Sequence, residues 1–310
     1  MAQKDPALRT LTLQSDTFSA TLYPALGGKI GQLQKDGVEL LQQPLKPYAL
    51  RDLAMGFEES DASGIDECLP SVAECILPDG VFVPDHGEYW RLPCEVTAST
   101  ATSATLSATG SVLPLRFDRT FTLTANELRI AYRVENVTSQ PLPWAWCAHP
   151  LYTVDAGDVL TLPESVSEVR LEGSGGGRLG TSGTKLNWPE ATLTDGSTTR
   201  LDVAAPETSG YGDKLFTAAP AEGWCRIERK QHGITLQIEF DPQLTPWLGL
   251  WLCYGGWPEG AANRQNAIAI EPCTAPMDSL AQAMETGYGR TLAPGEAASW
   301  WMSIRVRSGS

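Results

Sequence analysis

The chain has 310 residues, of which 42% are hydrophobic, and this length suits one large all-β domain or two ordinary domains. Its formal net charge is −14 and no cluster of lysine and arginine stands out, so nucleic acid and anionic membranes are disfavoured as partners, because both bind through cationic side chains. The 29 glycines and 22 prolines are typical of many strands joined by turns.

The N-terminal segment, residues 1–7, has no apolar core of the kind that a signal peptide needs. No run of about 18 apolar residues occurs that could cross a membrane as a helix. The seven cysteines are odd in number and include no Cys-x-x-Cys pair, which argues against a zinc or iron–sulfur centre. Free thiols suit a reducing compartment. We therefore expect a cytoplasmic protein without a bound metal.

Alternation of apolar and polar residues, the period of a half-buried strand, recurs along the chain. Asp36-Gly37 is a strong signal for a hairpin turn between residues 32–33 and residues 38–41. Residues 115–134 alternate on both sides of a turn at 125–127 and predict a second hairpin. The same pattern continues in two later segments, residues 234–240 and 300–306.

Helical periodicity is scarce. Residues 278–286 predict one short helix, capped by Asp278 or Ser279. The segment 173–183 contains six glycines and is predicted to be a flexible surface loop. Because no fixed-period repeat or linker interrupts the strands, we predict one continuous all-β domain over residues 1–310, a sandwich or a barrel.

Four polar clusters interrupt the strand patterns. They are Asp66-Glu67 within 64–70, His86 and Glu88 within 84–88, His149-Pro150 after an apolar strand, and Glu271 within 270–279. The chain has only three histidines, and imidazole is the one side chain whose unperturbed pKa allows proton transfer near neutral pH. Two histidines among Trp, Tyr, Gly and Pro are compatible with an acid–base site for a sugar.

Glu271 follows the apolar segment 266–270, which predicts a buried strand that ends at this carboxylate. Partial desolvation would raise the pKa of the carboxyl group and make it a better general base near neutral pH. A strand-end glutamate that faces solvent is the alternative.

Each histidine also has an ordinary structural interpretation. His149 follows the apolar strand 144–148 and could be a core histidine bonded to backbone, and His86 could be a turn residue. His232 precedes a glycine in a polar hairpin, and there the turn interpretation is preferred. The ten tryptophans could stack on sugar rings, but tryptophan is also a common core residue.

In their order, several short motifs resemble the aldose 1-epimerase (galactose mutarotase) family. The motifs are Gly27-Gly28-Lys29-Ile30, Gly37-Val38-Glu39-Leu40-Leu41, Pro84-Asp85-His86-Gly87, His149-Pro150, Ile270-Glu271-Pro272 and Leu292-Ala293-Pro294-Gly295-Glu296. The resemblance covers nearly the whole chain. It implies a large antiparallel β-sandwich, the galactose mutarotase-like supersandwich, with the sugar site in a concave groove and with no cofactor.

The resemblance also implies roles for individual residues. His149 matches the general acid of the family, Glu271 the general base and His86 a histidine that binds substrate. Asp213 lies where the family has a sugar-binding aspartate. The arginine-rich motif that the family has before its first histidine is missing here.

Other side chains could take over the contacts of that missing motif. Asp66 or Glu67 could hold sugar hydroxyls in its place, as could Glu88 beside His86. Arg51 and Arg91 are possible substitutes, although a surface or packing role is the preferred interpretation of both.

The implied reaction interconverts the α and β anomers of a monosaccharide by acid–base catalysis. Three alternatives stay open. A glycosidase could use two carboxylates such as Glu88 and Glu271, but it leaves His149 without a role. A phosphosugar epimerase would need a cationic cluster that the motifs lack. A non-catalytic carbohydrate-binding sandwich is the third, because fold does not determine function. We expect a monomer or a homodimer.

Overall fold

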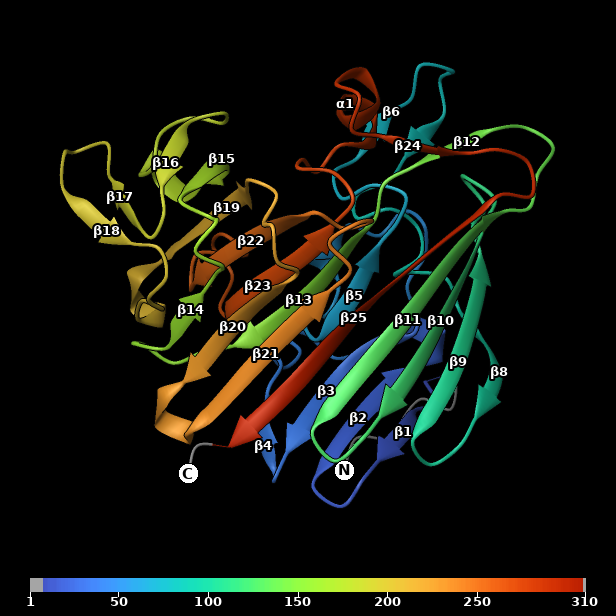
Figure 1. Ribbon diagram of the computed structural model, residues 1–310, viewed down its shortest axis with the longest axis horizontal. Helices are drawn as coiled ribbons and strands as arrows, with labels where there is room; N and C mark the ends of the chain where they lie inside the picture. Colours follow the sequence, from blue (N-terminus) through green and yellow to red (C-terminus); the bar gives the residue numbers. More distant parts are fainter. Residues whose placement is uncertain (1–7, 309–310) are drawn as a thin grey trace.

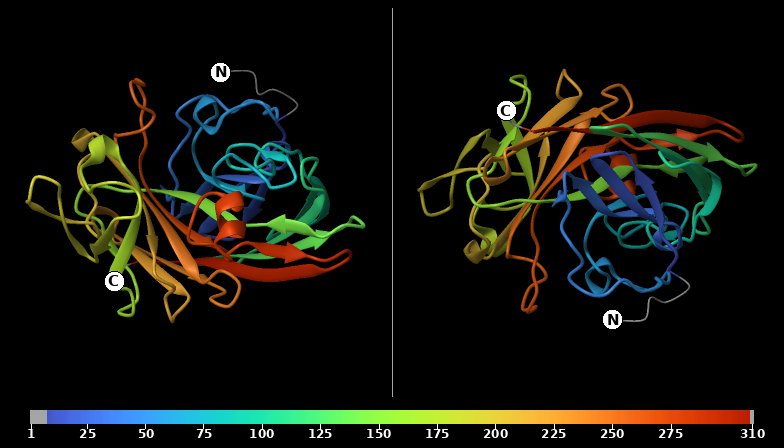
Figure 2. Two further views of the ribbon diagram at one scale, coloured as in Figure 1. Left: turned by 90° about the horizontal axis from the view of Figure 1, so that it is seen from above. Right: turned by 90° about the horizontal axis from the view of Figure 1, so that it is seen from below.

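A computed structural model describes residues 8–308, so the N-terminal segment considered for a signal peptide lies outside the described residues. Two large antiparallel sheets pack face to face (Figure 1). Two long connections of the N-terminal half, residues 40–64 and 69–94, precede and follow β5 (Ile65–Cys68) and lie on the outer side of the larger sheet (Figure 2). Within the described residues, no helix is long and apolar enough to cross a membrane.

The larger sheet has eleven strands and carries the candidate site. In spatial order they are β1 (Leu11–Gln14), β2 (Phe18–Tyr23), β3 (Lys29–Lys35), β5 (Ile65–Cys68), β13 (Cys147–Thr153), β23 (Asn266–Cys273), β22 (Trp247–Tyr254), β19 (Tyr211–Thr217), β15 (Glu168–Ser174) and β16 (Lys185–Asn187), with β4 (Val38–Glu39) paired to β3. Strands from both halves of the chain therefore meet at the centre of this sheet.

The second sheet has eight strands and closes the sandwich. In spatial order they are β14 (Val159–Thr161), β20 (Trp224–Arg229), β21 (Ile234–Phe240), β25 (Ala297–Ser308), β11 (Glu127–Asn136), β10 (Leu115–Leu123), β9 (Ser103–Thr109) and β8 (Glu95–Ser99). Three two-stranded pairs accompany the large sheets: β6 (Cys75–Ile76) with β7 (Phe82–Val83), β12 (Leu142–Trp144) with β24 (Arg290–Leu292), and β17 (Glu190–Thr192) with β18 (Thr198–Arg200). The described residues also form one short α-helix, α1 (Leu280–Glu285), and five 3-10 helices of three residues each.

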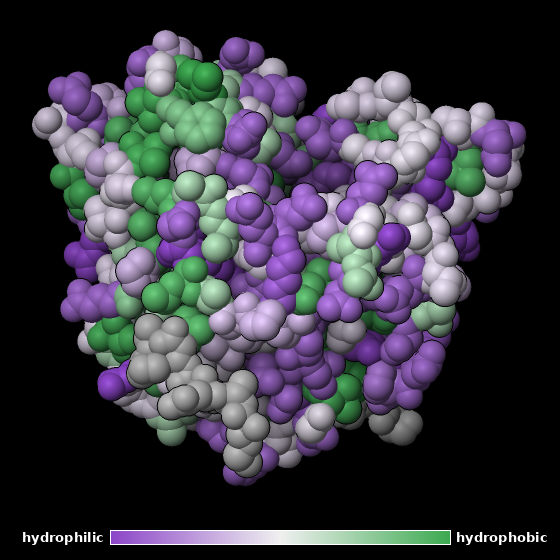
Figure 3. Space-filling model, turned by 180° about the vertical axis from the view of Figure 1, so that it is seen from behind, coloured by the Kyte–Doolittle hydropathy of each residue, from purple (hydrophilic) through white to green (hydrophobic). Residues whose placement is uncertain are grey.

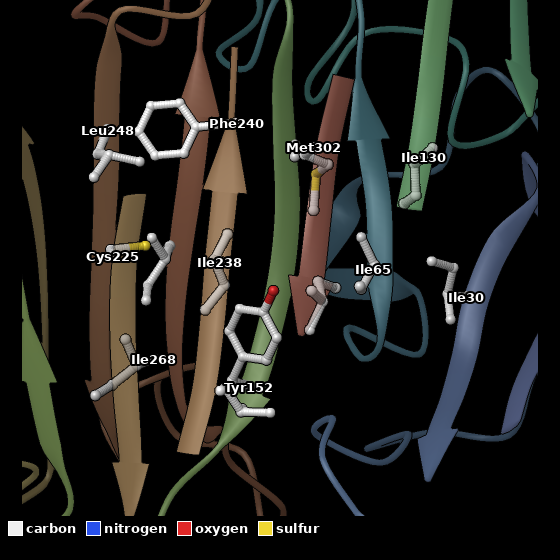
Figure 4. Packing of buried hydrophobic residues seen from close by; sticks show 14 of the residues in the cluster. Ile30, Ile65, Ile130, Tyr152, Cys225, Ile238, Phe240, Leu248, Ile268 and Met302 are labelled. Carbon is white, nitrogen blue, oxygen red and sulfur yellow. The ribbon is translucent and has the colours of Figure 1, made fainter. Parts of the chain in front are cut away.

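Strand alternation produces the core between the sheets. Successive side chains of a strand point to opposite faces, so every second residue of each strand enters the space between the sheets. Figure 4 shows such side chains from both sheets directed at one another: Ile30, Ile65, Tyr152, Leu248 and Ile268 from the larger sheet, and Ile130, Cys225, Ile238, Phe240 and Met302 from the second. Each of these residues is buried.

The predicted all-β sandwich is confirmed, and so are the predicted turns. Asp36-Gly37 joins β3 to β4, and the predicted hairpin over 115–134 is the β10–β11 pair. The predicted helix is α1, and Ser279 is its cap, because its hydroxyl accepts a hydrogen bond from the backbone N–H of Gln282. The seven cysteines are free thiols.

One predicted site residue, Glu67, lies in this core and does not line the cavity. It alternates with Asp66 on β5 and pairs across the sheet with Ala148, a residue of the core cluster. Its carboxylate accepts a hydrogen bond of 2.9 Å from the indole N–H of Trp146. Burial raises the pKa of Glu67 to about 7, against an opposing effect of Arg119. The carboxyl group is thus protonated in the folded protein at pH values where an exposed glutamate is ionised.

This raised pKa predicts a pH-dependent stability. The folded pKa of Glu67, about 7, lies above the ordinary value of 4.5, so the folded state holds the proton more tightly. The contribution of Glu67 to the stability of the folded state is fully present below the ordinary pKa, and it is lost as the pH rises through the folded value. We expect the free energy of unfolding of the wild type, relative to Glu67→Gln, to fall by up to about 1.4 kcal/mol per pH unit in this window. Urea denaturation at a series of pH values measures it, and parallel curves would contradict it.

Candidate active site on the outer face of the large sheet

The register of β13 and β23 brings the two predicted catalytic residues together. The two strands are antiparallel and Cys147 pairs with Cys273, so His149, two residues after Cys147, lies opposite Glu271, two residues before Cys273. Both side chains point away from the core, because the neighbouring Ile270 belongs to the inter-sheet cluster. The Nε2 atom of His149 lies 3.9 Å from Oε1 of Glu271.

Glu271 is held by one of its two carboxylate oxygens. The ammonium group of Lys214 on β19 donates to Oε2, and the Cys147 thiol lies 3.6 Å from the same atom. Oε1 is buried and has no hydrogen-bond partner within the described chain. The residue is completely buried, within β23 and not at its end, so it is more deeply desolvated than the sequence pattern predicted. An unpaired carboxylate oxygen beside a cavity is suited to accept a proton.

A glycine makes room for this ion pair. Gly249 on β22 stands directly opposite Glu271, and a Cβ atom there would lie 2.4 Å from Oε2 of Glu271. The same Cβ would lie 3.3 Å from Nζ of Lys214. The side chain of Lys214 therefore crosses β22 at Gly249, a position without a side chain, and so reaches Glu271.

His149 is buried and lies third in β13, which runs on through Pro150 instead of ending before the histidine as predicted. Its Nδ1 atom has no hydrogen-bond partner within residues 8–308. Burial lowers the pKa of His149 well below 6.5, and His86 and Lys214 lower it further. The free protein therefore holds this imidazole neutral at pH 7, whereas the sequence analysis assigned it as a protonated acid.

His86 lies beside His149, in the loop that follows β7. The two rings meet edge to face with centroids 5.2 Å apart. Phe57 stacks on His86 at 4.1 Å and meets His149 edge to face at 5.0 Å, so the three rings are in mutual contact. Nδ1 of His86 is 2.8 Å from a carboxylate oxygen of Asp85, which orients the ring. The backbone of His86 has a φ of 57°, in the left-handed region that non-glycine residues seldom adopt. Such strain is common at ligand sites.

These residues line a cavity of about 220 Å³. Its walls are formed by Phe57, Val72, His86, His149, Lys214, Trp251, Trp257, Gln265, Glu271 and Asp278. Aromatic faces and a few convergent polar groups are typical of a small-molecule site. Figure 3 shows the molecule from the side of the covering loops, with a mostly hydrophilic surface that is hollowed at its upper edge between two raised parts.

Several residues of this wall were not predicted from the sequence. Trp251 and Gln265 are joined by a hydrogen bond of 2.9 Å from the indole N–H to the amide oxygen. Asp278 was predicted only as a possible helix cap, yet its carboxylate lies 3.5 Å from Nζ of Lys214. Burial raises the pKa of Asp278. Lys214 is adjacent to Asp213, which was predicted as a site residue, but the sequence pattern did not indicate which of the two side chains faces the cavity.

Asp213 lies on the opposite face of β19 from Lys214 and does not line the cavity. Its buried carboxylate accepts hydrogen bonds from the guanidinium of Arg178, at 2.9 Å from Nε, and from the hydroxyl of Ser174, at 2.7 Å. Both partners belong to the glycine-rich segment predicted as a flexible loop, which is thereby anchored to the sheet. This carboxylate is engaged in holding that segment.

Glu88 is also engaged away from the cavity. Its buried carboxylate accepts hydrogen bonds from the backbone N–H groups of Ser111, Val112 and Leu113. Arg91 is buried too, and it donates to backbone carbonyl groups, including that of Met55 at 3.0 Å. Both residues therefore hold loops in place.

Asp66 shares the outer face with His149 and pairs with it across β5 and β13. It belongs to a buried cluster of four charges in which Lys29 and Arg51 each contact Asp61 and Asp66, and both Lys29–Asp61 and Arg51–Asp66 contacts are 3.0 Å long. Arg51 belongs to the loop that carries Phe57, so the cluster ties this loop to the sheet. Among the described residues, no group of three or more His, Cys, Asp or Glu is arranged to hold a metal ion.

Solved structures with this arrangement of strands carry the names that the motifs suggested. A candidate aldose 1-epimerase from Escherichia coli superposes with a TM-score of 0.72 at 19% identity, over 97% of this chain and 99% of that one. A galactose mutarotase-like protein from Lactobacillus casei superposes with a TM-score of 0.67 at 16% identity, over 96% of this chain and 100% of that one. A galactose mutarotase related enzyme from Lactobacillus acidophilus superposes with a TM-score of 0.68 at 15% identity, over 97% of this chain and 98% of that one.

The chain has the galactose mutarotase-like fold. No protein-family model and no curated protein sequence matches it. At sequence identities below one fifth, these superpositions establish the fold alone. The chemistry follows from the side chains of this chain.

The contact at Gly249 predicts a large effect from one methyl group. In Gly249→Ala the added Cβ must displace the Glu271 carboxylate or the Lys214 ammonium, and overpacking of this kind costs about 1–3 kcal/mol of stability. Gly173→Ala in β15 is the matched control, because its Cβ would meet nothing within 4 Å. Equal free energies of unfolding in the two variants would contradict the tight packing around the ion pair.

Proposed function

We propose that the protein is an aldose 1-epimerase, an isomerase that interconverts the α and β anomers of a monosaccharide. The observation that carries the proposal is the opposed pair His149 and Glu271 in an aromatic-walled cavity. One is a proton donor when charged and the other is a carboxylate with a free oxygen. General acid and general base groups of unlike type are what anomer exchange requires.

The proposed mechanism moves one proton in each direction. Oε1 of Glu271 takes the proton of the anomeric hydroxyl while the bond between C1 and the ring oxygen breaks, with its electron pair going to the ring oxygen. Protonated His149 gives its proton to that oxygen, which produces the open-chain aldehyde. Rotation about C1–C2 and the reverse transfers close the ring on the other face and restore both groups.

The wall of the cavity supports a neutral sugar as substrate. Trp251, Trp257 and Phe57 offer aromatic faces for the apolar side of a sugar ring. His86, Gln265 and Asp278 offer polar atoms for its hydroxyl groups. In this proposal His86, oriented by Asp85, binds substrate and lies next to the acid.

The alternatives fit the cavity less well. A phosphosugar epimerase needs a free cation, but the ammonium of Lys214 is in contact with both Glu271 and Asp278. A two-carboxylate glycosidase would use Glu88, whose oxygens are occupied by backbone N–H groups. A protein that only binds sugar remains as an outcome of the assay below.

Removal of either proposed catalytic group tests the assignment. We expect wild type to accelerate the equilibration of fresh α-D-glucose or α-D-galactose. The rate of this equilibration should fall by about 10²–10⁴-fold in His149→Ala and in Glu271→Gln. Polarimetry or NMR follows the anomers. His232→Ala is the control, because this exposed histidine pairs with Asp155 in a hairpin away from the cavity. A wild type that binds sugars without accelerating exchange would leave a binding protein, and full activity of Glu271→Gln would remove the proposed base.

The neutral state of His149 predicts an unusual pH dependence. Its pKa lies well below 6.5, so the protonated fraction that can serve as acid increases as the pH falls. We therefore expect kcat/KM for mutarotation to rise on acidification from pH 7.5 toward the pKa of His149, because kcat/KM reports the ionisation of the free enzyme. Stopped-flow polarimetry over this range measures it. A kcat/KM that stays constant or declines on acidification would exclude His149 as the acid.

A further inference from the structure

Lys214 occupies a position that the proposed reaction does not by itself explain. It lies on β19, two strands away from Glu271, and its side chain crosses β22 above Gly249 to reach the carboxylate. Its ammonium group also lies 3.5 Å from Asp278 and 5.3 Å from the ring of Phe216. Lys214 is thus packed between two carboxylates in the wall of the cavity.

We propose that Lys214 is a positioning residue that keeps Glu271 ionised and turns Oε1 toward the cavity. The ammonium occupies Oε2, and within residues 8–308 Oε1 has no hydrogen-bond partner on the side of His149. A completely buried carboxylate without a counter-ion takes up a proton, because desolvation penalises its charged form. A protonated Glu271 could not accept the proton of the anomeric hydroxyl.

The lysine itself stays charged in this environment. Burial acts to lower the pKa of Lys214, but the carboxylates of Asp278 and Glu271 outweigh burial and raise it well above 10.5. The cation is therefore present throughout the pH range in which Glu271 would act.

The ionisable groups around this pair come from several elements. Facing it are Cys147 and His149 on β13, Cys273 on β23, Cys68 on β5, Glu172 on β15, and His86 and Asp278 in loops. Burial raises the pKa values of Cys68 and Cys147, so these thiols remain uncharged near neutral pH. Asp278 is the anion that contacts Lys214 from the cavity side. Its removal should therefore shift the pKa of Glu271 in the direction opposite to the removal of Lys214.

A direct titration of Glu271 tests the proposal. Protein labelled with carbon-13 at the glutamate carboxyl carbons is titrated by NMR, and the Glu271 signal is identified by its loss in Glu271→Gln. In Lys214→Met the titration midpoint of this signal should move to higher pH by about one to three units, the usual effect of a close opposite charge. In Asp278→Asn it should move to lower pH, because a neighbouring negative charge is removed.

Two further variants separate charge from structure. Lys214→Arg keeps the cation and should leave the midpoint closer to wild type than Lys214→Met does. Lys185→Met is the matched control, because this exposed lysine pairs with Glu168 at 2.9 Å on the same sheet. Circular dichroism shows whether each variant is folded, and if Lys214→Met is not, the midpoint in Lys214→Gln decides, because this variant removes the same positive charge. A Glu271 midpoint equal to wild type in Lys214→Met, or an upward move in Asp278→Asn, would overturn the proposal.

The inference rests on the proposed function only for the role of Glu271 as base. The titration reads the carboxyl group without turnover, so a wild type that fails to catalyse mutarotation leaves the result interpretable. Where wild type is active, Lys214→Met should lose activity mainly on the acid side of the pH profile. A purely structural role of Lys214 would instead lower activity equally at every pH.

Discussion

The site depends on the register between β13 and β23. Because side chains alternate along a strand, a slip by one residue would turn His149 or Glu271 into the core and place an apolar neighbour at the cavity. The apolar side chains on the inner face, such as Ile270 and Tyr152, hold the register, since they have to meet the second sheet. The packing that stabilises the sandwich therefore also sets the 3.9 Å separation between Nε2 of His149 and Oε1 of Glu271.

Burial has a second consequence on the outer face. The loop with Phe57 and the loop with His86 cover the sheet, so that charged groups beneath them lose contact with water. Buried charges persist only when they are paired. The chain meets this requirement with two clusters, one around Arg51 and Asp66 and one around Lys214. The loops that enclose the cavity are thus anchored by the same ion pairs that their burial makes necessary.

Much of the architecture could be predicted from the sequence, because turn signals and period-two alternation act locally. The hairpins and the helix cap are examples. The strand with His149 was placed wrongly, since the apolar segment 144–148 was predicted to end before the histidine, whereas β13 runs from Cys147 to Thr153. Proline is accommodated there because the β13–β23 ladder has no paired residues between Cys147 and Leu151.

The site was predicted less completely, because face and depth are tertiary properties. Asp213 and Lys214 are adjacent, and strand alternation sends one inward and the other into the cavity. Which of them faces outward depends on pairing with β22, a strand more than thirty residues later in the chain. In the same way, Asp66 and Glu67 face opposite sides of β5.

The formal charges around His149 bear on its proposed role as an acid. On one side, Lys29 and Arg51 balance Asp61 and Asp66, so that cluster is neutral. On the other side, the single charge of Lys214 faces Glu271 and Asp278, which leaves one negative charge in excess. A proton taken up by His149 brings this second group to neutrality. In the proposed mechanism, the protonated His149 needed for ring opening therefore balances the charge of these three groups, and a neutral sugar adds no charge to them.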